Sequence, residues 1–393
     1  MTERTLQAIS WGLFCASSWT WCIGMYLPRI VIERFGWAGF LVFALPNVLF
    51  CAGFGYMVRT GERSRAWLAT QETRPLWFST VTIAYHLFFA AFLLMDRWPT
   101  DAGALDALPL QPMLGATIPI FIAAAANLLR DLSDTAWRRL GACAWLASAA
   151  LAISSLLGDA PLHIPVSREV PSHALLLAPV IALGFFASPW FDLTFHRALQ
   201  RSPSVHSFAI FGVGFAMMIV ATVAFWFRPT PMAQWTLVTH LLVQSIFTVG
   251  AHARERRTWW AANPGARGAG ARNLHLVATW APVLFFLALR AAKTEALRSL
   301  GEDTYLRFLG FYGLIAPIWL FFGNASRLSR RSRRVMVAAI ALSAPLLELA
   351  FIHPYREVGI IVALIIALGA AWTRGYERRH WATLGASRAT PSS

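Results

Sequence analysis

Residues 15–37 read CASSWTWCIGMYLPRIVIERFGW, and residues 182–203 read ALGFFASPWFDLTFHRALQRSP. Each stretch lies in a long apolar segment and interrupts it. Proline removes a backbone donor and clashes with the carbonyl group one turn earlier, and glycine weakens a helix at the same place. The interrupting residues are Gly24 and Pro28 in the first stretch and Gly184, Ser188 and Pro189 in the second. The two stretches therefore predict two helices that are broken near their middles.

The rest of the chain is apolar enough to cross a membrane many times. Its 393 residues are 57% hydrophobic and 13% charged, with a mean hydropathy of +0.53. A soluble domain has about 45–50% apolar and about 25% charged residues, so this chain has too little polar surface to cover a soluble core. A span needs roughly 20 mostly apolar residues. The sequence predicts an all-α integral membrane protein with about 12 transmembrane helices, at 6–32, 37–58, 75–95, 113–129, 139–157, 172–199, 205–227, 235–253, 274–289, 305–322, 335–352 and 358–372.

The basic residues predict how this bundle is oriented. The chain has 34 Lys and Arg residues against 19 Asp and Glu residues. If the N-terminus is cytoplasmic, 24 of the 34 basic residues fall in cytoplasmic segments. Cytoplasmic loops of membrane proteins normally carry an excess of Lys and Arg, so this orientation is favoured. We therefore expect both termini to be cytoplasmic, and we expect no nucleic acid partner. Lys293 is the single lysine, which fits a GC-rich genome and a bacterial inner membrane.

The two broken segments occupy matching positions in two halves of the chain. They lie five helices apart, and each is followed by a short connection and a long apolar helix. Because five is odd, the second unit enters the membrane from the opposite side, as in an inverted repeat. The predicted divisions are a first repeat at 1–157, a second repeat at 172–323, two accessory helices within 335–373, and a polar cytoplasmic tail at 374–393.

This arrangement resembles the LeuT-type fold of the amino acid–polyamine–organocation superfamily, and within it the sodium/solute symporter group. The resemblance implies a 5+5 inverted repeat in which helices 1 and 6 are broken. It also implies a secondary active transporter that moves a small organic solute by alternating access. The expected partners are the lipid bilayer and that solute, and the oligomeric state is left open. No cofactor is expected, but Na⁺ or H⁺ is the expected coupling ion. An ordinary bundle with two proline kinks is the alternative.

The same resemblance places the substrate site at the two breaks, where unwound backbone faces the transported solute. Unpaired backbone groups in lipid cost several kcal/mol each, so a break persists only where protein or a polar cavity covers it. Tryptophan faces attract cations, which favours a solute with an apolar or cationic part. The implied substrate-binding residues are Ser17, Ser18, Trp19, Thr20, Trp21, Gly24, His86, Ser188, Trp190, Phe191 and Asp192.

Asp192 is the residue with the most specific functional implication. Burying a carboxylate within the membrane costs free energy, so a functional role is the first hypothesis for Asp192. It can pair with a substrate amine or carry a coupling proton. It can also cap the helix that follows, by accepting from the free N–H groups near Thr194 and Phe195. His196 lies one turn later and is a possible partner for the carboxylate.

The coupling ion has two candidate sites. The resemblance implies hydroxyl groups of helix 8 that face the carbonyl groups of the first break and bind sodium, a hard cation that prefers oxygen. Ser245 and Thr248 are three residues apart and share a helix face. The adjacent pair of hydroxyl residues typical of that site is not evident, so a proton carried by Asp192 or His86 is the alternative.

The sequence lacks the common motifs of metal sites and hydrolytic enzymes. The cysteines have no CxxC spacing, which predicts neither a disulfide framework nor a zinc site. No HExxH motif and no nucleophile elbow occur, so we expect no catalytic residues and no enzyme. An intramembrane enzyme acting on a lipid, or a receptor or scaffold that transports nothing, is the alternative function. Glu348 lies within an apolar run, where it is expected to make a helix–helix contact or to reach toward the membrane surface.

Overall fold

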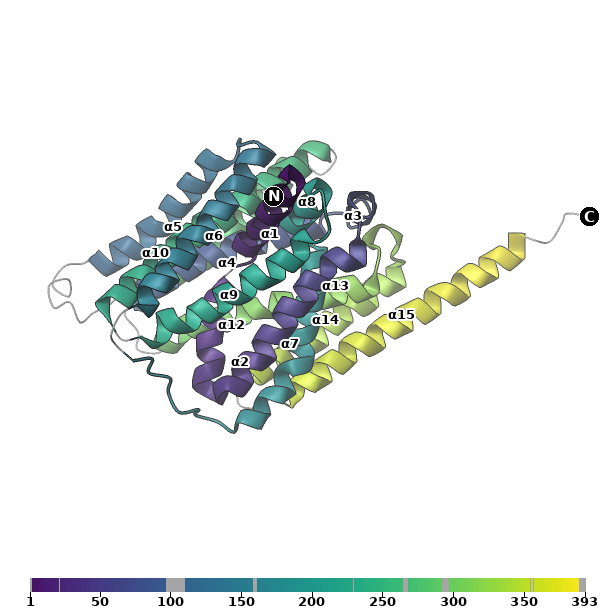
Figure 1. The fold of residues 1–393 in the computed structure, drawn as a ribbon. Coiled ribbons are helices and arrows are strands. Elements are labelled where there is room, and N and C mark those ends of the chain that lie inside the picture. The colour runs from purple at the N-terminus through teal and green to yellow at the C-terminus, as the bar shows by residue number, and fades with distance from the viewer. Residues whose placement is uncertain are drawn as a thin grey trace, which may run out of the picture.

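A computed structural model describes most of the chain, and every element in the described part is helical or irregular. The described residues are 2–20, 22–96, 110–157, 161–228, 230–263, 268–291, 297–353, 355 and 357–388. Trp21 and the final residues 389–393 therefore lie outside the described part. The helices form one elongated bundle, from which the last helix extends at one end (Figure 1).

The first predicted broken helix consists of α1 (Glu3–Trp19) and the first part of α2 (Cys22–Val58). Thr20 separates them with a ψ of 67°, which is outside the helical range. Within α2, Gly36 has φ 62° and ψ −151°, a conformation that glycine adopts readily and other residues rarely do. α2 therefore contains two helices, one that follows the break and one that returns across the bundle.

The second broken helix is built from four short pieces in succession: η1 (Pro171–Leu177), α7 (Ala178–Ala187), η2 (Ser188–Trp190) and α8 (Leu193–Arg201). The interruption falls at the Ser188–Pro189 step and ends at Asp192, where the sequence predicts it. Proline cannot donate to the preceding turn, and Asp192 begins the next helix by capping it.

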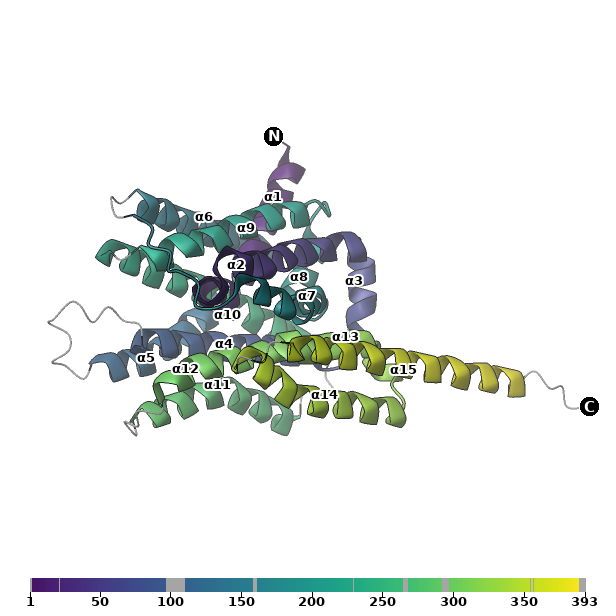
Figure 2. The same ribbon diagram turned by 90° about the horizontal axis from the view of Figure 1, so that it is seen from below.

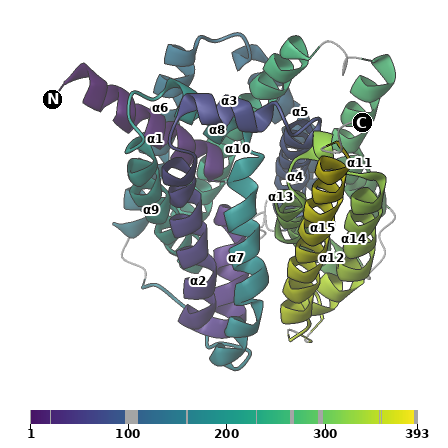
Figure 3. The same ribbon diagram turned by 90° about the vertical axis from the view of Figure 1, so that its right-hand side faces the viewer.

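The remaining predicted segments also lie in helices. These are α4 (Arg74–Asp96), α5 (Leu110–Leu129), α6 (Asp134–Leu156), α9 (Ser207–Phe227), α10 (Pro231–Ala262), α11 (Ala269–Ala291), α12 (Leu297–Gly310), α13 (Ala316–Phe322), α14 (Arg330–Phe351) and α15 (Val358–Arg388). A π-helix, η4 (Phe311–Ile315), joins α12 to α13, and η5 (Ala325–Arg327) follows α13. A short helix, α3 (Gly61–Leu68), lies across one end of the bundle (Figure 3).

Helix length and hydropathy agree with a membrane location. Within the described residues, eight helices are long and apolar enough to cross a membrane, and two shorter apolar helices accompany them. The chain is thus an all-α membrane protein. Figures 2 and 3 show two groups of helices side by side, one containing α1, α2, α6 and α9 and the other containing α4, α5 and α11–α15. Within the first group, α1 packs closely on α6, since a Cβ atom on Gly141 would lie 2.7 Å from the Cα atom of Phe14.

The structure corrects the predicted position of the first break. Gly24 and Pro28 lie inside α2, and the helix is interrupted earlier, at Thr20. Pro28 does leave the carbonyl group of Gly24 without its usual helical donor. The hydroxyl group of Thr222 in α9 donates to that carbonyl group at 3.2 Å, and the indole of Trp226 donates to the carbonyl group of Met25 at 2.6 Å. Thr222 thus replaces the missing donor, Trp226 binds the neighbouring carbonyl group, and the helix continues through the proline.

The structure also differs at the end of the chain. The predicted polar tail at 374–393 is helical as far as Arg388, because α15 continues beyond its apolar part. The start of α1 and the last turn of α15 lie at the same end of the bundle (Figure 3). We refer to this as the N-terminal end, and to the end where α2 turns at Gly36 as the opposite end.

Candidate functional site

The two helix breaks meet inside the bundle. The hydroxyl groups of Ser18, at the end of α1, and Thr194, at the start of α8, lie 3.0 Å apart. Thr194 Oγ1 is also 2.7 Å from Asp192 Oδ1, so its single hydroxyl proton can go to either oxygen. All three side chains are fully buried. The two breaks are therefore joined through one small network of buried hydroxyl and carboxylate groups.

The carbonyl groups at the first break are bound by side chains from other helices. Thr248 Oγ1 in α10 donates to the carbonyl oxygen of Ser17 at 3.2 Å, while Ser17 Oγ donates to the carbonyl oxygen of Gly141 in α6 at 2.9 Å. The hydroxyl and backbone N–H groups of Thr20 both reach the carbonyl oxygen of Ala16. The end of α1 is thus held between α6 and α10 by hydroxyl groups.

Trp19 contributes an aromatic wall to the same region. Its indole N–H donates to Oδ1 of Asn47 in α2 at 2.9 Å. Its ring centroid lies 4.6 Å from that of Phe195, on the other broken helix. An indole ring that is fixed by a buried hydrogen bond presents a rigid apolar surface beside the hydroxyl groups.

At the second break, side chains again satisfy the backbone. Ser188 Oγ donates to the carbonyl oxygen of Gly184 at 2.7 Å, and the indole of Trp67 in α3 donates to the carbonyl oxygen of Trp190 at 2.8 Å. The predicted pairing of His196 with Asp192 is not formed. Instead, His196 Nε2 contacts the carbonyl oxygen of Trp190 at 3.0 Å, and its Nδ1 contacts Ser64 Oγ at 2.8 Å.

Trp190 and Phe191 pack against aromatic rings of other helices. The Trp190 ring packs against Trp67 and Phe54, with centroid distances of 5.0 and 5.6 Å. The Phe191 ring packs against Trp319 of α13 at 5.6 Å. These two side chains therefore anchor the second break to α3 and α13.

Asp192 both caps a helix and approaches a histidine. Its Oδ1 accepts from the backbone N–H of Thr194 at 2.7 Å, so the capping role considered from the sequence is realised. Its Oδ2 lies 3.9 Å from Nε2 of His252 in α10. Neither side chain has measurable solvent exposure. The sequence does not predict His252 as a site residue, because it lies next to the arginines of a predicted loop. Its helical spacing from Thr248, four residues earlier, is the one signal that could have indicated an inward position.

Three other predicted residues lie outside this junction. Gly24 faces α9, where a Cβ atom added to it would lie 3.5 Å from the ring of Phe215. Ser245 lines a cavity of about 20 Å³ between α4, α5 and α10, so it does not share the position of Thr248 beside Ser17. His86 is buried in α4, where its Nδ1 contacts the carbonyl oxygen of Thr82 at 2.8 Å. Trp21 is outside the described residues, and the structure places nothing there.

Ion pairs close the N-terminal end of the bundle beneath the breaks. Arg197 of α8 forms a bidentate ion pair with Glu255 of α10, with N–O distances of 2.9–3.2 Å. The two side chains are only 12% and 6% exposed. Asp134, at the start of α6, pairs with Arg201 at 2.8 Å and also with Arg254. These pairs join α6, α8 and α10, and α8 cannot move away without breaking them.

Hydrogen bonds close the opposite end. The hydroxyl group of Tyr26, in the helix after the first break, donates to Glu302 of α12 at 3.1 Å. The hydroxyl group of Tyr305 donates to the carbonyl oxygen of Cys22 at 3.0 Å. Beneath them, a cavity of about 30 Å³ lies between Ile23, Gly184 and Tyr312, roughly one water molecule in size. The junction of the breaks is thus covered from both ends.

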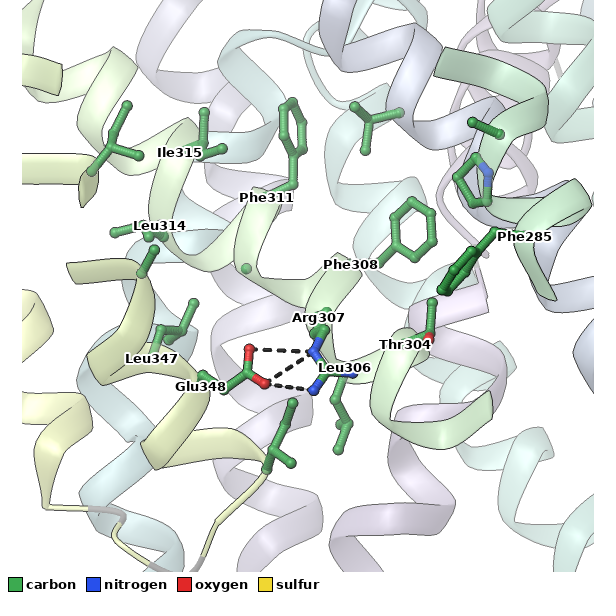
Figure 4. A pocket seen from close by; sticks show the side chains of 17 residues that line it. Phe285, Thr304, Leu306, Arg307, Phe308, Phe311, Leu314, Ile315, Leu347 and Glu348 are labelled. Carbon is green, nitrogen blue, oxygen red and sulfur yellow. Dashed lines mark hydrogen bonds and ion pairs between the residues drawn. The ribbon is translucent and has the colours of Figure 1, made fainter. Parts of the chain in front are cut away.

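A larger apolar groove of about 770 Å³ lies elsewhere, between α4, α11, α12 and α14 (Figure 4). At its rim, Arg307 forms a bidentate ion pair with Glu348, with N–O distances of 2.6–3.3 Å. Glu348 therefore makes a helix–helix contact, one of the two roles expected for it. Phe311, Leu314 and Ile315 of the π-helix line this groove, whereas Tyr312 and Gly313 line the small cavity beside the second break. The groove is separate from the breaks.

Comparisons with known proteins show a similarity of fold and none of sequence family. No family model matches the sequence, and no curated protein matches it. The fold matches the crystal structure of a manganese transporter from Eremococcus coleocola, solved in complex with an aromatic bis-isothiourea-substituted compound. The sequences are 12% identical, the TM-score is 0.56, and the match covers 96% of this chain and 97% of the other.

This match has consequences for the fold and for the site. The solved structure is that of a transporter. At 12% identity the likeness concerns the fold, and it does not transfer the cargo. Within the described part of the chain, no group of three or more His, Cys, Asp or Glu side chains is placed to hold a metal ion. From the fold match, the chain has the fold of a membrane transporter.

Proposed function

We propose that this protein is a secondary active transporter that moves a small organic solute across a membrane by alternating access. The observation that carries the proposal is the junction of the two breaks, where Ser18 and Thr194 approach to 3.0 Å although 176 positions separate them. Broken helices that meet at mid-depth provide polar backbone and side chains for a solute where lipid cannot solvate it.

The same geometry supports the LeuT-type architecture inferred from the sequence. In this proposal, α1–α6 form the first repeat, η1–α13 form the inverted second repeat, and α14 and α15 are accessory. Both repeats begin with a broken helix, and the two breaks lie against each other. The protein is assigned to a bacterial inner membrane with both termini cytoplasmic, as the loop arginines predict.

The proposed solute class follows from the side chains at the junction. Trp19 and Phe195 supply aromatic surface, Ser18 and Thr194 supply hydroxyl groups, and Asp192 supplies one carboxylate. Such a set suits an organic molecule with an apolar or cationic part. The coupling ion in this proposal is sodium, at the contact between Ser17 and Thr248, or a proton at Asp192.

Alternating access requires two closures that open in turn, and candidates for both are present. The Arg197–Glu255 ion pair closes the N-terminal end, and the Tyr26–Glu302 hydrogen bond closes the opposite end. Each closure connects a helix next to a break with a helix of the surrounding scaffold. Opening one while the other stays closed would expose the junction to one side of the membrane at a time.

The proposal is tested by solute counterflow in proteoliposomes containing the purified full-length protein. The panel contains labelled amino acids, polyamines, choline, betaine and nucleobases, with Mn²⁺ as a separate arm. We expect exchange of at least one organic solute, and loss of that exchange in Ser18→Leu, which fills the junction. Ser154→Leu is the matched control, because Ser154 is exposed on α6. Exchange of Mn²⁺ alone would contradict the solute class, and exchange of nothing would contradict transport.

A further inference from the structure

Asp192 presents one oxygen that its capping role does not use. Oδ1 binds the backbone and hydroxyl groups of Thr194. Among the described residues, Oδ2 finds no hydrogen-bond donor, and it is directed toward Nε2 of His252 at 3.9 Å. A buried carboxylate without a counter-charge is costly, and a proton held between an acid and an imidazole removes that cost.

Neutral and charged groups from several helices face this pair. Those that interact electrostatically with the carboxylate are Cys15 of α1, Cys51 of α2, Glu255 of α10 and Tyr312 of η4. Those that interact with the histidine include His86 of α4 and Arg256 of α10. Glu255 is already neutralised by Arg197, and Arg256 contacts Thr80 and Thr279. Among the described residues, His252 is therefore the only basic side chain within ion-pair distance of Asp192.

Polar side chains lead from this pair toward the N-terminal end of the bundle. His252 Nδ1 lies 3.2 Å from Ser79 Oγ in α4. The next residue, Thr80, lies 2.8 Å from Nδ1 of His275, near the start of α11. Hydroxyl and imidazole groups can each accept and donate a proton, so Ser79 can exchange a proton with His252, and Thr80 with His275 forms a second such contact beside it on α4. Farther along α4, His86 Nε2 finds no partner within the described part of the chain.

We propose that Asp192 and His252 together form the site of the coupling proton. This inference rests on the proposed transport function and selects the proton over sodium. The proton binds between Asp192 Oδ2 and His252 Nε2 from one side of the membrane and leaves to the other, and no other bond is made or broken. The sodium alternative is weaker, because the hydroxyl group of Thr248 already donates to the carbonyl oxygen of Ser17 and Ser245 lies elsewhere.

The position of the pair explains how protonation would affect the breaks. Asp192 Oδ1 holds Thr194, and Thr194 Oγ1 lies beside Ser18 on the other broken helix. When a proton draws the carboxylate toward His252, its hold on Thr194 changes, and so does the contact between the two breaks. Loss of the proton leaves a buried negative charge that favours rearrangement.

The first experiment measures the proton directly and needs no solute. Infrared difference spectra of the purified protein are recorded during a pH titration. We expect the C=O stretching band of a protonated carboxylic acid to titrate in the wild type, to vanish in Asp192→Asn, and to shift its midpoint in His252→Gln. His240→Gln is the matched control, since His240 is also buried in α10 but stacks on Phe225, and no ion pair joins it to an acid within the described part of the chain. A titration that His252→Gln leaves unchanged would overturn the shared proton.

The second experiment separates coupling from transport. A solute found by counterflow is offered to proteoliposomes with a proton gradient, a sodium gradient or neither. We expect the proton gradient to drive accumulation in the wild type and in His240→Gln. In His252→Gln, we expect loss of accumulation while counterflow persists. Counterflow with accumulation driven only by sodium would overturn the proton site and leave transport intact. If no solute exchanges, transport itself fails, and the infrared titration still decides whether the pair shares a proton.

Discussion

The hydroxyl group of Tyr26 donates a hydrogen bond to Glu302 at 3.1 Å, and this contact links the helix after the first break to α12. Tyr26 is fully buried, and its ring also packs edge-on against Tyr305, with a centroid distance of 5.0 Å. The Tyr26 hydroxyl group thus connects the helix after the first break, which moves in the proposed mechanism, to α12 at the opposite end of the bundle.

Removing that hydroxyl group should open the opposite end more often. Tyr26→Phe keeps the ring and deletes a hydrogen bond worth about 1 kcal/mol, which corresponds to roughly a fivefold shift in an equilibrium. Cys22 lies beneath this closure and is fully buried. With the other three cysteines replaced by alanine, maleimide labelling of Cys22 should become roughly fivefold faster. Tyr56→Phe, at the N-terminal end, should leave the labelling rate unchanged, and equal rates for both variants would contradict this assignment.

The Arg197–Glu255 ion pair should stabilise the closed N-terminal end. Because both side chains are almost buried, loss of one partner leaves an uncompensated charge, and Glu255→Gln should destabilise that closed arrangement by about 3–5 kcal/mol. The check is the thermal unfolding midpoint in detergent, together with maleimide labelling of Cys15, which is buried in α1. The exchanged pair Arg197→Glu/Glu255→Arg should recover part of the loss. No recovery would indicate that each residue acts separately.

The two breaks should be energetically coupled through Ser18 and Thr194. Ser18→Ala and Thr194→Val each remove one hydroxyl group of the junction. The double variant should lose less stability than the two single variants combined, with a coupling energy of about 1 kcal/mol. Unfolding in denaturant, monitored by tryptophan fluorescence, measures the cycle. Strict additivity would mean that the 3.0 Å approach contributes nothing to stability.

The carbonyl group freed by Pro28 should depend on Thr222. Thr222→Val removes the donor to the carbonyl oxygen of Gly24 and should destabilise the protein by about 1–2 kcal/mol. In a Pro28→Ala background the restored backbone N–H can bind that carbonyl oxygen, so the same change should cost much less. Thermal unfolding of the four combinations tests this. Thr239→Val, on the exposed side of α10, should have little effect in either background.

The helices and the second break are predictable from the sequence for local reasons. A run of roughly 20 apolar residues requires a helix in lipid regardless of its neighbours. At Ser188–Pro189, the missing backbone donor and the capping residue Asp192 lie within four positions of one another. Both signals are contained in one short stretch, so the sequence suffices to place the break.

The first break is displaced because its compensating contacts come from a distant part of the chain. Thr222 and Trp226, which keep α2 helical through Pro28, lie about 200 positions away, and no local pattern announces them. The partnership of Asp192 with His252 is hidden in the same way, since it depends on how α8 and α10 cross. His196 is nearer in sequence, but its imidazole is already engaged by Ser64 and Trp190.

Since α1 begins and α15 ends at the same end of the bundle, the proposed orientation places both helix ends on one side of the membrane (Figure 3). A fluorescent protein attached at either terminus would therefore experience the same compartment. Two copies could also be fused head to tail through a flexible linker, with no additional span between them. Such a tandem would allow a defective copy to be combined with an intact one in a fixed ratio.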